Sequence, residues 1–179
     1  SHCRGAVRQA QRTLVKAIGL QEFNALSERQ RMHLLFEVCS STIWARRVVA
    51  GSPFRDTEAL FDRADRVLAE LPDAEIDAAL DGHPRIGAKA DNPSSAREQA
   101  RVADAGDAVK AALAAKNREY EDRFGYVYLV CASGRSADEL LAILTDRLDN
   151  DAETERRVMR NELAKINRLR LERMVSEPT

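Results

Sequence analysis

Only one stretch of this chain has the composition of a β-strand, the run "FGYVYLVCASG" at residues 124–134. A strand without a partner leaves its backbone N–H and C=O groups unpaired, so an isolated strand is not a stable element. We therefore expect a short extended, buried segment near residues 126–132. The rest of the sequence follows helical periodicity almost throughout, which predicts an all-α fold, a single compact domain of about eight to ten helices.

Sequence patterns typical of helix starts, helix ends and amphipathic helices occur along the chain. The segment 56–71 places apolar side chains every three or four residues, and Pro72 then stops it. Capping-box patterns, a serine followed three residues later by Glu or Gln, predict helix starts at Ser27, Ser95 and Ser136. We expect the helix that begins at Ser95 to run toward Ala105. Further helices are predicted over residues 73–80, 107–123 and 151–175.

Size and charge limit the classes of protein to consider. The 179 residues suffice for one sizeable domain, and the formal net charge of −1 provides no overall field for nucleic acid or an anionic membrane. Residues 1–18 are the exception, because Arg4, Arg8, Arg12 and Lys16 would form a basic stripe on an N-terminal helix or extension. That stripe is either a solvated face or a contact for a partner or nucleic acid.

The cysteines and the hydropathy favour a cytoplasmic location. Three widely spaced cysteines include no CxxC pair, which argues against a disulfide framework and against a Cys-rich zinc site. No apolar run approaches the length of a membrane span, and the N-terminus lacks the apolar core of a signal peptide. We expect no membrane association and no metal site.

Among motifs with chemical meaning, "HPRIG" at residues 83–87 is distinctive. Phosphate loops, nucleophile elbows and metal-binding histidine pairs are absent from the sequence. Pro84 disfavours the helical conformation at His83, so the imidazole lies at a fixed break after a helix. Residue logic alone leaves His83 either a structural or exposed loop residue, or a catalytic one.

Arg170 and the pair Ser95 and Glu98 are further candidates for a functional site. Arg170 falls within the apolar row of the last helix, and a buried guanidinium needs either a protein carboxylate or a substrate carboxylate. The pair Ser95 and Glu98 is explained by a capping box alone, yet a helix N-terminus with a nearby carboxylate also suits a small polar heterocycle. Both alternatives stay open at this level.

Taken in order, the motifs resemble those of the 2-oxo-4-hydroxy-4-carboxy-5-ureidoimidazoline (OHCU) decarboxylases, which complete the route from urate to (S)-allantoin. The resemblance covers about residues 20–175 and sets the domain at residues 19–179. Its motifs are "FEVCSSTIWARRV", "SPF", "HPRIG", "SAREQA", "NREYEDRFGYVYLVCASGRSA", "RLDND" with the following Glu155, and "NELAKINRLRLERM".

The resemblance implies an all-α carboxy-lyase that uses no cofactor, acts on a small molecule and commonly forms a homodimer. It makes His83 the proton donor, with Glu98 and Arg170 as substrate anchors in the catalytic set. The substrate-binding residues that it implies are Pro84, Ser95, Ala96, Arg97, Glu98, Gln99, Tyr128, Leu129, Val130, Cys131 and Ala132.

Two features depart from the family pattern. The loop between His83 and Ser95 is shorter than in animal relatives, which puts pocket contacts from that loop in doubt. The basic residues 4–16 lie outside the shared pattern. A helical interaction or nucleic-acid-binding module without catalysis is therefore the rival interpretation, and it predicts salt-sensitive binding instead of turnover.

Overall fold

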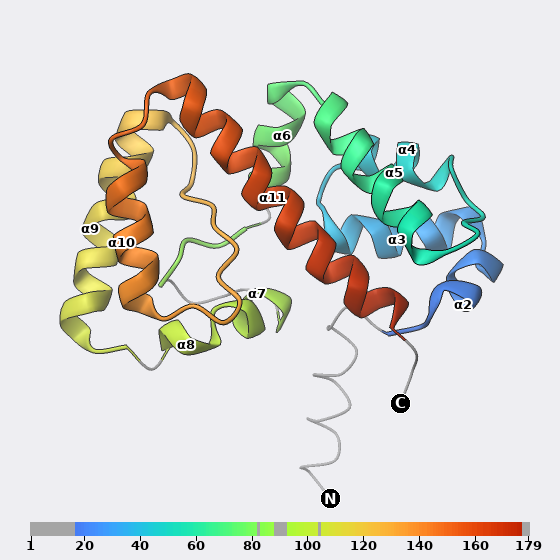
Figure 1. Cartoon of the computed structure of the whole chain (residues 1–179), viewed down its shortest axis with the longest axis horizontal. Coiled ribbons are helices and arrows are strands. Elements are labelled where there is room, and N and C mark those ends of the chain that lie inside the picture. The colour runs from blue at the N-terminus through green and yellow to red at the C-terminus, as the bar shows by residue number, and fades with distance from the viewer. Residues whose placement is uncertain (1–16, 82, 88–92, 104, 177–179) are drawn as a thin grey trace, which may run out of the picture. The chain divides into compact units, whose positions relative to one another are not determined.

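The computed structural model of the chain describes residues 17–81, 83–87, 93–103 and 105–176. Within these ranges every regular element is an α-helix and no residue forms a β-strand, which confirms the all-α prediction (Figure 1). The helices are α2 (Leu20–Ala25), α3 (Glu28–Val38), α4 (Thr42–Val49), α5 (Thr57–Glu70), α6 (Asp73–Leu80), α7 (Pro93–Glu98), α8 (Ala100–Ala103), α9 (Asp107–Phe124), α10 (Ala137–Arg147) and α11 (Ala152–Val175).

The described residues form two compact units. The first unit contains residues 17–81 and 166–176, and the central unit contains the described residues between 83 and 165. Helix α11 contributes its first part to the central unit and its last part to the first unit. The basic stripe predicted for residues 4–16 lies outside the described residues.

The first unit is built on helices that the sequence specifies clearly. Ser27 and Gln30 form the predicted capping box of α3, and Asp56 caps α5 through the backbone N–H of Ala59. Helix α4 packs against α3 and α5, and the indole of Trp44 is fully buried with its N–H donating to the carbonyl oxygen of Ala64. The predicted apolar stripe of α5 is buried along its length: Leu60, Phe61, Ala64, Val67, Leu68 and the following Leu71.

The central unit has α9 and α10 side by side, with the extended segment beside them (Figure 1). Its core combines residues of both helices with residues of that segment, and Ser136 and Glu139 form the predicted capping box of α10. Residues 127–132 are neither helix nor strand, and Tyr128, Leu129, Val130 and Ala132 are buried. The predicted extended, buried segment is therefore present.

The predicted helix start at Ser95 is wrong. Helix α7 begins at Pro93, so Ser95 is its third residue and not its N-cap, and α7 ends at Glu98 before the separate short helix α8. Proline is favoured at the first helical position, since its fixed φ suits the helix and the N–H it lacks would have no helical partner there. Helix α2 has no counterpart among the predicted helices.

Candidate functional site

The loop that carries His83 is fixed to helix α9 of the central unit. The Asn117 side-chain amide donates to the carbonyl oxygen of Ile86 at 3.0 Å. The Arg85 guanidinium pairs with Glu121 through Nε to Oε1 at 2.7 Å and Nη2 to Oε2 at 3.2 Å, and Glu121 raises the pKa of Arg85. His83 itself is half-buried. The sequence "HPRIG" is thus a main-chain turn tied to a long helix.

The end of α7 approaches the same loop. The backbone N–H of Gly87, a residue with a φ of 88°, donates to the side-chain Oε1 of Gln99 at 3.0 Å. Ser95 and Gln99 are buried and Glu98 is half-buried, whereas Ala96 and Arg97 are exposed. Ser95, Glu98 and Gln99 are spaced i, i+3 and i+4, so their side chains point to the same side of the chain. Of the predicted residues of α7, Ala96 and Arg97 therefore lie on its exposed side.

The extended segment presents alternate side chains to different neighbours, as extended backbone does. Tyr128, Val130 and Ala132 enter the hydrophobic core of the central unit. Cys131, which is half-buried, lies near the carboxylates of Glu98 and Glu162 instead. Burial raises the pKa of the Cys131 thiol, and both carboxylates raise it further. Glu98 of α7 and Cys131 of the extended segment thus belong to one neighbourhood.

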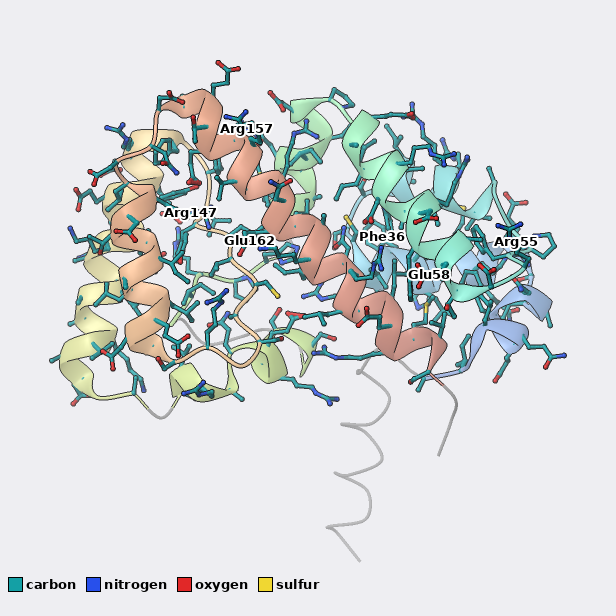
Figure 2. All side chains as sticks on the ribbon, in the orientation of Figure 1. Phe36, Arg55, Glu58, Arg147, Arg157 and Glu162 are labelled. Atoms are coloured by element: carbon teal, nitrogen blue, oxygen red, sulfur yellow. The ribbon has the colours of Figure 1, made fainter. Side chains whose placement is uncertain are left out.

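Two charged side chains hold the main chain of this segment. Arg147 of α10 donates from Nη1 to the carbonyl oxygen of Leu129 at 2.6 Å. Glu162 of α11 accepts from the backbone N–H of Cys131 at 3.2 Å. Both side chains are labelled in Figure 2. Since the described residues include no strand that could satisfy these backbone groups, the two side chains do so in place of a β-ladder.

Arg147 is itself part of a buried network. Its guanidinium contacts Glu155 through Nη2 to Oε2 at 2.7 Å and Nε to Oε1 at 2.8 Å, and the two side chains are 6% and 0% exposed. The Tyr120 hydroxyl donates to Glu155 Oε2 at 2.6 Å. Burial raises the pKa of Tyr120, and the hydrogen bond to Glu155 raises it further. The network joins α9, α10 and α11 to the extended segment.

Arg170 lies in the first unit. It is buried, and its Nη1 donates to the carbonyl oxygen of Val38 at 3.0 Å. The neighbouring Cys39 is buried, which raises the pKa of its thiol to about 11, while Asn167 and Arg170 act to lower it. Arg170 therefore contacts the C-terminal end of α3. A shared cavity with His83 stays a prediction, since the two residues belong to different units.

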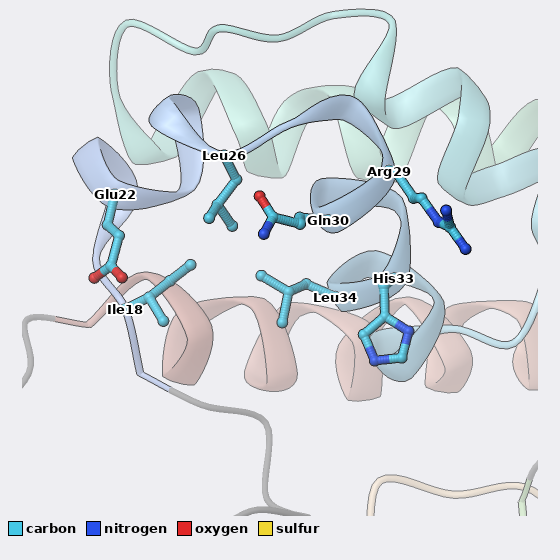
Figure 3. Close-up of a pocket in the computed structure, with 7 residues that line it drawn as sticks. All are labelled: Ile18, Glu22, Leu26, Arg29, Gln30, His33 and Leu34. Carbon is cyan, nitrogen blue, oxygen red and sulfur yellow. The ribbon is translucent and has the colours of Figure 1, made fainter.

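A hollow of about 430 Å³ lies in the first unit, between α2 and α3 (Figure 3). Ile18, Leu26 and Leu34 form its apolar lining, and polar side chains that include Glu22 and His33 complete it. None of the predicted site residues lines this hollow. We assign the candidate site to the central unit, which contains every predicted site residue except Arg170.

Comparison with known proteins decides the family. The family model described as OHCU decarboxylase matches residues 24–172. The chain belongs to this family. The match covers most of the chain and runs through both units, so an OHCU decarboxylase domain includes both. It begins within α2 and therefore leaves out residues 1–23.

Among curated relatives, the 2-oxo-4-hydroxy-4-carboxy-5-ureidoimidazoline decarboxylase of Amia calva is 28% identical over 169 residues, covering 89% of this chain and 95% of the relative. The uric acid degradation bifunctional protein of Bacillus sp. (strain TB-90) is 24% identical over 162 residues, or 88% of this chain. The chain spans about a third of that longer protein, 32% of its length.

Solved structures have the same fold. A crystal structure of OHCU decarboxylase in the presence of (S)-allantoin has a TM-score of 0.72 at 24% identity, covering 79% of this chain and 96% of that one. A crystal structure of (S)-allantoin synthase has a TM-score of 0.69 at 15% identity, covering 88% of this chain and 54% of that one. These likenesses establish the OHCU decarboxylase fold for the chain.

Three charged residues that support the site, Arg147, Glu155 and Glu162, were not predicted from the sequence. Glu155 and Glu162 lie at helical spacing with the apolar stripe of α11, and Arg147 continues the buried stripe of α10. A charged residue at an inward-facing position of a helix needs a partner. The same helical spacing that marks Arg170 is therefore the signal in the sequence for these three residues.

Across the described ranges, no group of three or more His, Cys, Asp or Glu side chains is arranged to hold a metal ion. No helix among the described residues has the length and apolar character to span a membrane.

Proposed function

We propose that the chain catalyses the decarboxylation of OHCU to (S)-allantoin in urate breakdown. One observation carries this proposal: the OHCU decarboxylase match runs through three segments of the central unit, in which Gln99 accepts from the Gly87 N–H and Glu98 acts electrostatically on the Cys131 thiol. These segments are the His83 loop, the end of α7 and the extended segment. A small, polar, anionic heterocycle is the substrate class that suits their mixture of carboxylate, amide and backbone groups.

The decarboxylation requires no organic cofactor as an electron sink. In the substrate, the carbon that bears the carboxylate adjoins a ring C=N bond. When CO₂ leaves, the electron pair of the broken C–C bond flows toward that C=N bond, so the substrate supplies its own electron sink and needs no organic cofactor. The protein has to orient the carboxylate out of the ring plane, and one proton added to a single face then fixes the product as the S enantiomer.

In the proposed mechanism, His83 delivers this proton. A histidine has an ordinary pKa near 6.5, so it exchanges protons readily around neutral pH. Its loop is tied to α9 through Ile86 and Arg85, which favours a fixed direction of approach. Glu98, which is half-buried and raises the pKa of the Cys131 thiol, is proposed to accept hydrogen bonds from ring N–H groups. Arg170 is proposed to bind the substrate carboxylate or a carbonyl oxygen.

The remaining proposed contacts are shared by α7 and the extended segment. We propose that Pro84, Ser95 and Gln99 line the pocket, together with the main chain of residues 128–132. Ala96 and Arg97 are exposed, so we expect them to contribute less to substrate binding than the buried Ser95 and Gln99. Gln99 Oε1 accepts from the Gly87 N–H, so this residue also supports the His83 loop.

We further propose a homodimer in the cytoplasm. The dimer follows from the family resemblance, and the reducing compartment agrees with Cys39 and Cys131, which are both free thiols. Light scattering coupled to size-exclusion chromatography tests the dimer: a mass near twice 20.0 kDa is expected, and a mass near 20.0 kDa at micromolar concentration contradicts it.

The decisive test of the activity uses freshly generated urate-oxidation product after its hydrolysis to OHCU. Purified protein is added, and circular dichroism follows the formation of optically active allantoin. We expect faster formation with the S enantiomer in excess. Racemic allantoin at the uncatalysed rate contradicts the proposal. Binding of DNA or RNA that weakens steeply with salt, with no turnover, favours a nucleic-acid-binding module through the basic residues 4–16.

A further inference from the structure

Glu162 occupies an unusual position for a carboxylate. It lies on the apolar stripe of α11, between the buried Met159 and Ile166, and is itself buried. Its Oε1 accepts the backbone N–H of Cys131 at 3.2 Å, and its Oε2 pairs with Lys165 Nζ at 2.7 Å. One carboxylate thus serves a main-chain group on one side and a lysine on the other.

The contact to Cys131 falls within residues 128–132, the part of the extended segment that is proposed to line the pocket, and the Cys131 thiol lies within electrostatic range of Glu98. Arg147 holds Leu129 and the Tyr128 hydroxyl donates to the carbonyl oxygen of Leu140, so the start of the segment is fixed to α10. Cys131 lies further along, at a point that Glu162 holds from α11. Without that acceptor, a part-buried backbone N–H in non-helical, non-strand chain loses its partner, and the main chain there is free to shift.

We infer that Glu162 is a positioning residue of the proposed decarboxylase: by accepting the backbone N–H of Cys131, it fixes the main chain of the extended segment where that segment is proposed to line the substrate pocket. The inference rests on the proposed function and deepens it. Glu162 acts through the backbone of Cys131 and touches no reacting atom. This positioning requires an acceptor oxygen at the end of a side chain as long as that of glutamate, and it does not require the negative charge.

Four variants separate reach from charge. Glu162→Gln keeps an acceptor oxygen at the same reach and removes the charge. Glu162→Asp keeps the charge and shortens the reach by one methylene. Glu162→Met keeps the approximate volume and removes both acceptor and charge. Lys165→Met removes the ion pair alone, and Lys165 is 61% exposed, so this variant is the matched control.

The experiment measures kcat and KM for OHCU with each variant and the parent, beside the thermal unfolding midpoint. We expect Glu162→Met and Glu162→Asp to lower kcat/KM by about tenfold or more, mainly through KM, because the displaced main chain weakens substrate binding before the chemical step. Glu162→Gln and Lys165→Met should stay within about threefold of the parent. If kcat/KM is retained in Glu162→Gln and lost in Glu162→Met, the loss follows from the missing acceptor oxygen and not from a general loss of stability.

Two results overturn the inference. One is an unchanged kcat/KM in a folded Glu162→Asp or Glu162→Met variant. The other is a Glu162→Gln variant as impaired as Glu162→Met, which would make the charge the operative property. If the parent enzyme itself has no activity, the proposed function fails, and the alkylation rate of Cys131 by iodoacetamide then tests the contact alone. That rate, followed by peptide mass spectrometry, should rise in Glu162→Met above the rate in Glu162→Gln, and equal rates overturn the inference.

Discussion

The two units of this protein differ in how their buried backbone N–H and C=O groups are satisfied. In the first unit, most backbone groups are satisfied within helices, with a few side-chain contacts such as those of Asn24 and Arg170, and packing of apolar faces such as the stripe of α5 builds the core. In the central unit, a loop and an extended segment carry candidate site residues. One backbone group each at Ile86, Gly87, Leu129 and Cys131 is satisfied by the side chains of Asn117, Gln99, Arg147 and Glu162, respectively. The candidate site therefore depends on buried polar side chains, whereas most of the first unit depends on hydrophobic contact.

This difference explains why charged residues occur on inward-facing helix positions. A helix supplies no free backbone donors in its middle, so a site that uses main-chain groups needs non-helical chain. Such chain, once buried, needs partners supplied by side chains. Arg147 and Glu162 therefore belong to the construction of the site as well as to the fold.

The largest contrast should be in activity, between two histidines of different units. His83→Ala is expected to lower kcat by about 10²- to 10⁴-fold, the range typical for loss of a general acid. His33→Ala, at the exposed rim of the hollow between α2 and α3, should leave kcat unchanged. Initial rates of (S)-allantoin formation measure both. Equal effects of the two substitutions would remove the reason for placing the site in the central unit.

The next effect concerns the stability of the central unit. Arg147→Met leaves Glu155 buried without its guanidinium partner, and breaking a buried pair in this way costs about 3–5 kcal/mol of unfolding free energy. Urea unfolding followed by far-ultraviolet circular dichroism measures the loss. The double variant Arg147→Met, Glu155→Leu removes both charges and should recover a large part of it. A double variant as unstable as the single one contradicts the account of the network.

A smaller effect is expected at Asn117. Asn117→Ala removes the hydrogen bond to the carbonyl oxygen of Ile86 and should cost about 1–3 kcal/mol of unfolding free energy. Because this amide holds the His83 loop, kcat/KM should fall as well. The matched control is Asn24→Ala in the first unit, whose amide bridges Phe54 in a comparable way. That variant should lose similar stability with little change in kcat/KM, and an equal loss of activity would contradict the assignment.

The smallest effect should be at an exposed ion pair of the first unit. Arg168 contacts Asp65 at 3.0 Å, and both side chains are accessible to solvent. Exposed pairs contribute about 0–1 kcal/mol. Arg168→Met, which keeps the apolar stem, should therefore change the unfolding midpoint only slightly. A loss as large as that of Arg147→Met would show that the two units do not differ in their dependence on charge.

Much of this organisation could be predicted from the sequence, because helical periodicity and capping are local signals. The helix over residues 73–80 has the predicted bounds, and the capping boxes at Ser27 and Ser136 are confirmed. The start at Ser95 was wrong because two local signals competed, and a proline at the first helical position outweighed the serine.

The support of the site could not be predicted from local patterns. Asn117 binds Ile86 across 31 positions of the chain, and Glu162 binds Cys131 across the same separation. Such contacts depend on the packing of helices, which periodicity does not specify. The sequence did indicate that His83 lies at a break and that residues 126–132 form an extended segment, and the functional meaning of both came from the family resemblance.

The most direct test of the central claim is to map the binding of (S)-allantoin onto the folded chain. Backbone amide chemical shifts measured by nuclear magnetic resonance during titration would locate the ligand at single residues. We predict that the largest changes fall on residues 83–87, 94–99 and 128–132, which lie in the central unit. Changes confined to the hollow beside Ile18, Leu26 and Leu34, with those three segments unaffected, would contradict the account.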